Sequence, residues 1–248
     1  MRDHLQLTNP LRITALMLFC AALALLLAQS SNLCAAEPDQ PALERKTVVV
    51  SGDSLAAGLG VEEAAAFPAL LQQKIDAAGL DYSVVNAGVS GDTSADGLNR
   101  INWLLKRKID VLILELGGND GLRGLPISAT KSNLQGIIDR VKQKYPQAQL
   151  VIAGMQMPPN MGEDYTRWFK SIFPELAQKN QAALIPFLLE GVGANPKLNQ
   201  PDLIHPTAEG HKIVAENVWK VLKPILRTSA GQVNRPIGKF THISIRSS

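Results

Sequence analysis

The sequence predicts an α/β protein, a three-layer α/β/α sandwich around a mainly five-stranded parallel sheet. Short β-branched and apolar runs alternate with longer amphipathic stretches along most of the chain. That alternation is typical of a parallel sheet covered by helices on both faces. A length of 248 residues suits one such domain with a sizeable core. The 46% hydrophobic and 19% charged residues are ordinary for a globular protein and argue against a polytopic membrane protein.

The secondary-structure elements follow from periodicity and from their flanking residues. The predicted strands are residues 47–50, 82–85, 111–116, 150–153 and 183–187. The predicted helices, one after each strand, are residues 67–78, 94–106, 128–144, 165–180 and 207–222. Gly79 and Pro224 are natural stops for the first and last helices, and Ser128 and Thr207 are natural amino-terminal caps.

The first 36 residues are predicted to be a signal peptide. Arg2 and Arg12 precede an uncharged apolar run over residues 13–28, which is short for a membrane span but suits a signal peptide. Cys34-Ala35-Ala36 offers a cleavage site before Glu37. We therefore expect a bacterial protein exported to the periplasm or secreted, with no stable membrane insertion after cleavage. An uncleaved amino-terminal anchor is the alternative.

The remainder divides into a catalytic domain over residues 45–227 and a polar tail over residues 228–248, which we expect to be disordered. The tail carries Arg235, Lys239 and Arg246 without an acidic residue, so much of the net charge of +3 lies outside the domain. The domain itself is nearly neutral and has no basic face interleaved with aromatic residues. This pattern argues against a nucleic-acid partner.

Both cysteines, Cys20 and Cys34, lie in the predicted leader. Cleavage after Ala36 would leave a mature protein without any cysteine. A disulfide, a cysteine nucleophile and a thiolate metal site are then all excluded.

Four short polar segments carry the chemistry of the chain. They are Gly52-Asp53-Ser54-Leu55, Ser90-Gly91-Asp92, Gly117-Gly118-Asn119-Asp120 and Asp202-Leu203-Ile204-His205. The first three follow the first three predicted strands directly, and the fourth lies between the last strand and the last helix. Because parallel strands end at a common sheet edge, where such folds build their sites, we expect the four segments to converge.

Ser54 is the candidate nucleophile, since it lies on a strand-to-helix turn at this edge. Taken alone, a Gly-Asp-Ser turn is more often a helix cap. Outside the leader the only histidines are at positions 205, 211 and 242. His205 is the best candidate for a general base, because Asp202 three residues earlier can orient its imidazole. The alternative is that Asp202 and His205 only stabilise a loop, and the two interpretations of this motif are about level.

An acyl-transfer site also needs donors for an oxyanion. A glycine at position 91 lets the backbone approach a ligand closely, and the side-chain amide of Asn119 can supply a second donor. The backbone N–H of Ser54 would be the third. Singly, these residues are also explained as ordinary turn residues. The joint occurrence of all four segments in order favours acyl hydrolysis.

The four segments resemble the conserved blocks of the GDSL, or SGNH, hydrolase family, over roughly residues 47–226. The longer motifs Asn86-Ala87-Gly88-Val89-Ser90-Gly91-Asp92-Thr93-Ser94 and Glu115-Leu116-Gly117-Gly118-Asn119-Asp120-Gly121-Leu122-Arg123-Gly124 look like the bacterial exported thioesterase, arylesterase and lysophospholipase branch. The resemblance implies a flavodoxin-like fold and the catalytic residues Ser54, His205 and Asp202. It also implies oxyanion donors at Ser54, Gly91 and Asn119, a small acyl ester, thioester or lysophospholipid substrate, and no metal or cofactor.

Substrate contacts are less constrained by the sequence. Candidates for contact with the acyl group are Leu122, Leu125, Met155, Met157 and Met161, because they follow the third and fourth predicted strands and methionine adapts to flexible chains. Simple packing is an equal alternative for them. We expect a monomer with an open groove, since short connections leave little room for a lid. A carbohydrate O-deacetylase of the same fold and a noncatalytic lipid-binding module are the alternative functions.

Asp53, Asp92 and Asp120 are expected to organise the loops of this site by accepting backbone hydrogen bonds, without a catalytic role.

Overall fold

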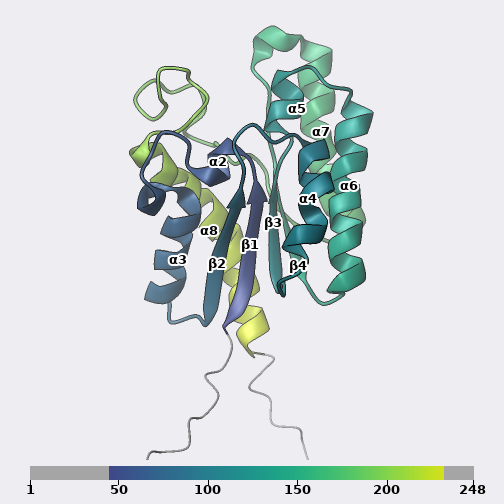
Figure 1. Cartoon of the computed structure of the whole chain (residues 1–248). Helices are drawn as coiled ribbons and strands as arrows, with labels where there is room; N and C mark the ends of the chain where they lie inside the picture. Colours follow the sequence, from purple (N-terminus) through teal and green to yellow (C-terminus); the bar gives the residue numbers. More distant parts are fainter. Residues whose placement is uncertain (1–44, 232–248) are drawn as a thin grey trace, which may run out of the picture. The chain divides into compact units, whose positions relative to one another are not determined.

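The computed structural model of the chain describes residues 45–231, which form the predicted three-layer sandwich (Figure 1). All neighbouring strands are parallel, in the order β2-β1-β3-β4-β5. The strands are β1 (Lys46–Gly52), β2 (Tyr82–Gly88), β3 (Val111–Glu115), β4 (Gln149–Ala153) and β5 (Ala183–Ile185). The fold class expected from the sequence is thereby confirmed. The predicted signal peptide and residues 232–248 of the predicted tail lie outside the described residues.

Helices cover both faces of the sheet (Figure 1). On one face α3 (Phe67–Ala77) packs against β2 and against α8 (Ala208–Gly231), which also contacts β4 and β5. On the other face α6 (Ile127–Lys144) packs between α4 (Ser94–Leu104) and α7 (Glu163–Asn180). Four short elements complete the fold: α2 (Ser54–Ala57), η2 (Glu63–Ala65), α5 (Gly118–Leu122) and η3 (Pro159–Met161).

The core lies on both faces of the central strands. Val48, Val49 and Val50 of β1 and residues 111–114 of β3 are buried, which explains why these strands read as continuous apolar runs rather than alternating ones. A continuous cluster of buried side chains joins these strands to the helices on either side. The sheet is therefore a rigid platform whose carboxyl-terminal edge can hold side chains in fixed positions.

The helix boundaries agree with the sequence at two predicted signals and disagree at two. Gly79 follows α3 with φ +65°, and the Oγ1 of Thr207 accepts the N–H of Gly210 at 3.3 Å, so these two signals are confirmed. Ser128 is not a cap, because α6 already begins at Ile127 after Pro126.

Pro224 is not a stop either. It lies inside α8, which continues to Gly231 and so passes the predicted start of the tail. The buried side chains of Leu222 and Leu226 flank Pro224 and anchor the helix on both sides of it. Tertiary packing thus holds the helix together where proline alone would end it.

Within residues 45–231 no helix is both long and apolar enough to cross a membrane.

Candidate active site

The turn after β1 presents the hydroxyl group of Ser54 at the carboxyl edge of the sheet. β1 ends at Gly52, and Asp53 caps α2 by accepting the N–H of Leu55 on its Oδ1 atom at 3.0 Å. Ser54 is therefore the first residue of a helix that begins immediately after a buried strand. Only 7% of this serine is exposed, so it is held in one place with little contact with bulk water.

His205 and Asp202 complete a continuous chain of hydrogen bonds with Ser54. The Ser54 Oγ lies 2.8 Å from the His205 Nε2, and the His205 Nδ1 lies 2.6 Å from the Asp202 Oδ2. The imidazole can therefore take a proton from the hydroxyl while the carboxylate stabilises the imidazolium that forms. Among residues 45–231, His205 is the histidine that reaches Ser54, whereas His211 bonds to the N–H of Phe67. His242 lies outside the described residues.

A tight turn brings Asp202 back onto His205. The second carboxylate oxygen, Oδ1, accepts the N–H groups of Ile204 at 2.9 Å and His205 at 3.0 Å. Leu203 between them has φ +61°, a conformation that non-glycine residues rarely adopt. The three-residue spacing can place the carboxylate beside the imidazole because the backbone makes this turn.

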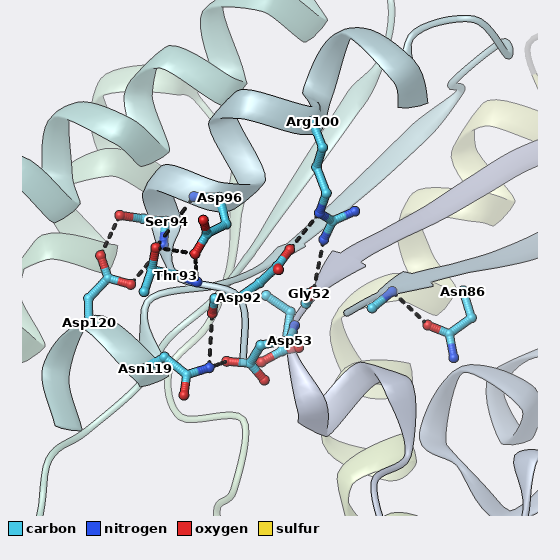
Figure 2. Close-up of polar contacts among 12 residues, drawn as sticks. Gly52, Asp53, Asn86, Asp92, Thr93, Ser94, Asp96, Arg100, Asn119 and Asp120 are labelled. Atoms are coloured by element: carbon cyan, nitrogen blue, oxygen red, sulfur yellow. Dashed lines mark hydrogen bonds and ion pairs between the residues drawn. The ribbon is translucent and has the colours of Figure 1, made fainter. Parts of the chain in front are cut away.

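The segments after β2 and β3 meet the turn that carries Ser54 at the same edge. The Asn119 Nδ2 donates to the backbone oxygen of Asp92 at 2.9 Å and to the Asp53 Oδ2 at 3.3 Å (Figure 2). Gly91, immediately before Asp92, has φ +87°. These contacts place the Asn119 amide and the Gly91 backbone beside the Ser54 turn, as the convergence of the segments predicts.

An apolar pocket of about 280 Å3 opens beside Ser54, over the ends of β3, β4 and β5. Its walls come from four separate segments of the chain. The lining residues are Leu55, Gly118, Leu122, Met155, Gln156, Met157, Pro158, Pro159, Phe187, Leu189, Gly193, Ala194, Leu203 and Ile204. A pocket of this composition suits an unbranched or flexible apolar group attached to a carbonyl at Ser54.

Comparison with known proteins agrees with this geometry. The sequence model of the GDSL-like Lipase/Acylhydrolase family matches residues 50–213, which include Ser54 and His205. The chain belongs to this family. It is 41% identical over 182 residues to esterase TesA of Pseudomonas aeruginosa, covering 73% of this chain and 90% of the relative. Over 181 residues it is 39% identical to thioesterase 1/protease 1/lysophospholipase L1 of Escherichia coli K12, covering 73% and 85%.

Solved structures give the same result. The crystal structure of the psychrotrophic esterase EstA from Pseudoalteromonas sp., inhibited by monoethylphosphonate, superposes with a TM-score of 0.69 at 30% identity. The match covers 73% of this chain and 99% of that one.

Three of the five predicted acyl-contacting residues of this GDSL-family chain line the pocket: Leu122, Met155 and Met157. Leu125 does not, because its backbone groups bond to the Asp120 oxygen and the Tyr165 hydroxyl and draw it toward α7. Met161 also lies outside the lining, although Pro159 at the start of the same helix η3 is part of it.

The far wall of the pocket comes from residues 186–207, a long connection where short ones were expected. Leu203 and Ile204 lie in this wall and are 47% and 39% exposed. The sequence signal that could have indicated this wall was the apolar pair Leu203-Ile204 between Asp202 and His205.

The loop carboxylates of the GDSL blocks act as expected in two cases of three. Asp53 accepts a backbone N–H in its own turn, and Asp120 accepts the Ser94 N–H at 2.7 Å together with the hydroxyl groups of Ser94 and Thr130. Asp92 instead pairs with a side chain, the Arg100 guanidinium, at 2.6 Å. That guanidinium also donates to the Gly52 oxygen at 3.0 Å and so ties α4 to the end of β1 (Figure 2).

Burial shifts the pKa values of Asp53 and His211. Burial raises the pKa of Asp53 to about 6, against the lowering effect of its bond from Leu55. Burial also lowers the pKa of His211 to about 4, and its Nδ1 accepts the N–H of Phe67 at 3.3 Å, so this imidazole is neutral at neutral pH.

Asp202 shows the opposite behaviour to Asp53. Desolvation alone would raise its pKa, but the bonds from the His205 ring and from the backbone N–H groups of His205 and Ile204 lower it to about 2. Asp202 is therefore ionised throughout the neutral range, as an orienting carboxylate must be.

Among residues 45–231 no group of three or more His, Cys, Asp or Glu side chains is placed to hold a metal ion.

Proposed function

We propose that this GDSL-family hydrolase is a serine esterase that cleaves acyl esters and thioesters through an acyl-enzyme intermediate. The observation that carries the proposal is the hydrogen-bonded chain from the Ser54 Oγ through His205 to Asp202, with links of 2.8 and 2.6 Å. A hydroxyl group, a base and an orienting carboxylate in this order are the parts that acyl transfer requires.

In the first step His205 takes the Ser54 proton at its Nε2 while the Oγ attacks the substrate carbonyl carbon. The imidazolium, held by Asp202, then gives this proton to the departing alcohol or thiol. In the second step the same imidazole activates a water molecule, which attacks the acyl-enzyme ester. Collapse of that intermediate releases the carboxylic acid and returns the proton to Ser54.

The negative charge on the carbonyl oxygen of each intermediate needs donors that are already in position. The backbone N–H groups of Ser54 and Gly91 and the Asn119 Nδ2 are the donors that we assign. The longer of the two Asn119 bonds, at 3.3 Å to Asp53, is the one that the substrate oxygen would replace. The shorter bond to the Asp92 oxygen would keep the amide oriented during the reaction.

The acyl group would occupy the apolar pocket beside Ser54, and the names of the relatives are compatible with such substrates. The apolar lining does not favour the carbohydrate O-deacetylase alternative, because an acetyl group would leave most of the pocket unfilled. The presence of the complete Ser-His-Asp chain likewise does not favour a noncatalytic lipid-binding module.

The test is hydrolysis of p-nitrophenyl esters and acyl-CoA thioesters of increasing acyl length by the mature domain and by Ser54→Ala. We expect turnover to fall by ~10³-fold or more in the variant and a serine-directed phosphonate to label Ser54. EstA, a relative at 30% identity, is described as inhibited by monoethylphosphonate. Undiminished turnover in Ser54→Ala would contradict the mechanism, and a preference for acetyl esters of sugars would favour the deacetylase.

We also infer that the protein is exported and acts as a monomer on a small acyl ester, thioester or lysophospholipid. The support for export is the predicted leader, which lies outside the described residues.

A further inference from the structure

A buried carboxyl group lies directly beneath the nucleophile turn. Glu115, the last residue of β3, has no exposed surface, and its Oε2 accepts the backbone N–H of Asp53 at 3.2 Å. The other oxygen, Oε1, is buried and has no hydrogen-bond partner among residues 45–231. A buried acid that neither forms an ion pair nor touches the proposed reacting atoms calls for a physical explanation.

The neighbouring sequence is adapted to this carboxyl group. Gly52 lies opposite Glu115 in the register of β1 and β3, and a Cβ atom at Gly52 would overlap the Glu115 Oε2. The glycine therefore lets the carboxyl group reach the backbone of the turn. Without that space, the side chain could not lie against the N–H of Asp53.

The carboxyl groups of Glu115 and Asp53 determine which backbone N–H groups of the turn are hydrogen-bonded and which are not. The Asp53 N–H is bound by Glu115, and the Leu55 N–H is bound by the Asp53 side chain. The Ala57 N–H bonds to the Asp53 backbone oxygen at 2.9 Å. Among the described residues, no acceptor binds the N–H of Ser54. The donor that the proposed mechanism assigns to the oxyanion is thus left free.

The charge state of Glu115 follows from its surroundings. Burial, and then the charge of nearby Asp53, hold the pKa of Glu115 well above its ordinary value, while the N–H groups of Asp53 and Ala56 oppose the shift. Asp92, Asp120 and His205 act on Asp53 from the other segments of the site. A neutral carboxyl group keeps a carbonyl oxygen that can accept an N–H without placing a second negative charge beneath the oxyanion.

We propose that Glu115 is a positioning residue for acyl transfer, whose Oε2 holds the Asp53 N–H so that the Ser54 N–H points at the substrate oxygen. This role rests on the proposed function, because it acts through the nucleophile and the oxyanion donor. It involves no proton transfer to or from the substrate. Glu115 needs an oxygen acceptor at Oε2 and does not need a negative charge.

The test separates the acceptor from the charge. Glu115→Gln keeps a carbonyl oxygen and removes the charge, whereas Glu115→Met removes both at similar volume. We expect kcat of Glu115→Gln to stay within ~3-fold of wild type and kcat of Glu115→Met to fall by ~10–100-fold with KM nearly unchanged, because loss of one aligned oxyanion donor costs up to ~10³-fold. Glu175→Gln, an exposed carboxyl group paired with Lys131, is the matched control and should resemble wild type.

A second measurement does not depend on the folding of Glu115→Met. Amide hydrogen exchange at Asp53 should be slow in both wild type and Glu115→Gln, because the acceptor persists. Equal loss of kcat in Glu115→Gln and Glu115→Met, unchanged kcat in a folded Glu115→Met, or rapid exchange of the Asp53 amide in wild type would each overturn the proposal. Failure of the esterase assignment itself would appear separately, as absent phosphonate labelling of Ser54 in wild type.

Discussion

Replacement of Asp202 by asparagine tests the proposed mechanism at its most exposed member. The Asp202 Oδ1 accepts the N–H groups of Ile204 and His205, and its Oδ2 accepts from the His205 ring at 2.6 Å. Asparagine can keep the first set of bonds with its oxygen, which places its NH2 group against the Nδ1 of His205. The Nδ1 must then act as an acceptor, so the hydrogen moves to the Nε2. In this tautomer the Nε2 can no longer take the proton of Ser54.

The size of the effect follows from the bond that is lost and from its exposure. A charge-assisted hydrogen bond contributes ~1.5–3 kcal/mol, which corresponds to ~10–150-fold in rate. The wrong tautomer raises the loss to ~10⁴-fold where the carboxylate is buried, as in the trypsin-like template. The Asp202 side chain is 43% exposed, and water can replace part of its interaction. We therefore expect kcat of Asp202→Asn to fall by ~10²–10³-fold.

The assay is steady-state hydrolysis of a short-chain p-nitrophenyl ester, with the unfolding midpoint measured in parallel. Asp164→Asn, an exposed carboxylate of α7 that pairs with Arg167, is the matched control and should keep wild-type activity. A kcat within ~3-fold of wild type for a correctly folded Asp202→Asn would refute the reasoning, because catalysis would then not depend on the orientation of His205.

Three further predictions follow from the packing and the pKa shifts. Gly121→Ala would place a Cβ atom in overlap with the Met157 sulfur and 2.8 Å from the Phe169 ring. We therefore expect the unfolding free energy, measured by denaturation, to fall by ~1–3 kcal/mol. We also expect a preference for shorter acyl chains, measured with a series of esters of increasing chain length. Pro224→Ala should raise the unfolding free energy by ~1–3 kcal/mol, because Pro224 is exposed inside α8 and lacks the N–H that the helix uses; a lower midpoint would contradict this. On acidification the unfolded chain binds a proton at His211 before the folded chain does, because burial in the folded chain lowers the pKa of His211 from 6.5 to about 4. The contribution of His211 to stability should therefore fall by up to ~3 kcal/mol from pH 6.5 to pH 4. Asp53, whose pKa burial raises to about 6, contributes with the opposite sign as the pH falls below 6, so the His211 contribution is the difference between the pH series of denaturant melts of wild type and of His211→Gln.

Most of the fold could be predicted because its signals are local. Buried parallel strands read as continuous apolar runs, and Gly79 and Thr207 mark helix ends through their own backbone and hydroxyl chemistry. The prediction that Pro224 ends the last helix was wrong, because the tertiary packing of Leu222 and Leu226, buried on either side of it, outweighs the local preference of proline. Ser128 failed for a related reason, since α6 begins one residue earlier and leaves no cap position for it.

The candidate site divides in the same way. Ser54, Gly91, Asn119, Asp202 and His205 could be named from sequence because each lies in a short polar segment at a strand end or before a helix, where few alternative residues exist. Leu125 lies outside the lining of the apolar pocket, and its contact with an acyl group stays a prediction.

By itself, the sequence determined the order of the elements, the chemical types at the sheet edge and the family resemblance, because these depend on residue identity and spacing along the chain. Only the tertiary structure decided the 2.8 Å contact between Ser54 and His205, the pocket wall from residues 186–207 and the burial of Glu115 beneath the nucleophile turn. The physical reason is that distance, desolvation and competition for hydrogen-bond donors are set by segments far apart in sequence. The sequence does not single out Glu115, because its contact with the turn depends on Gly52 lying opposite it in the sheet.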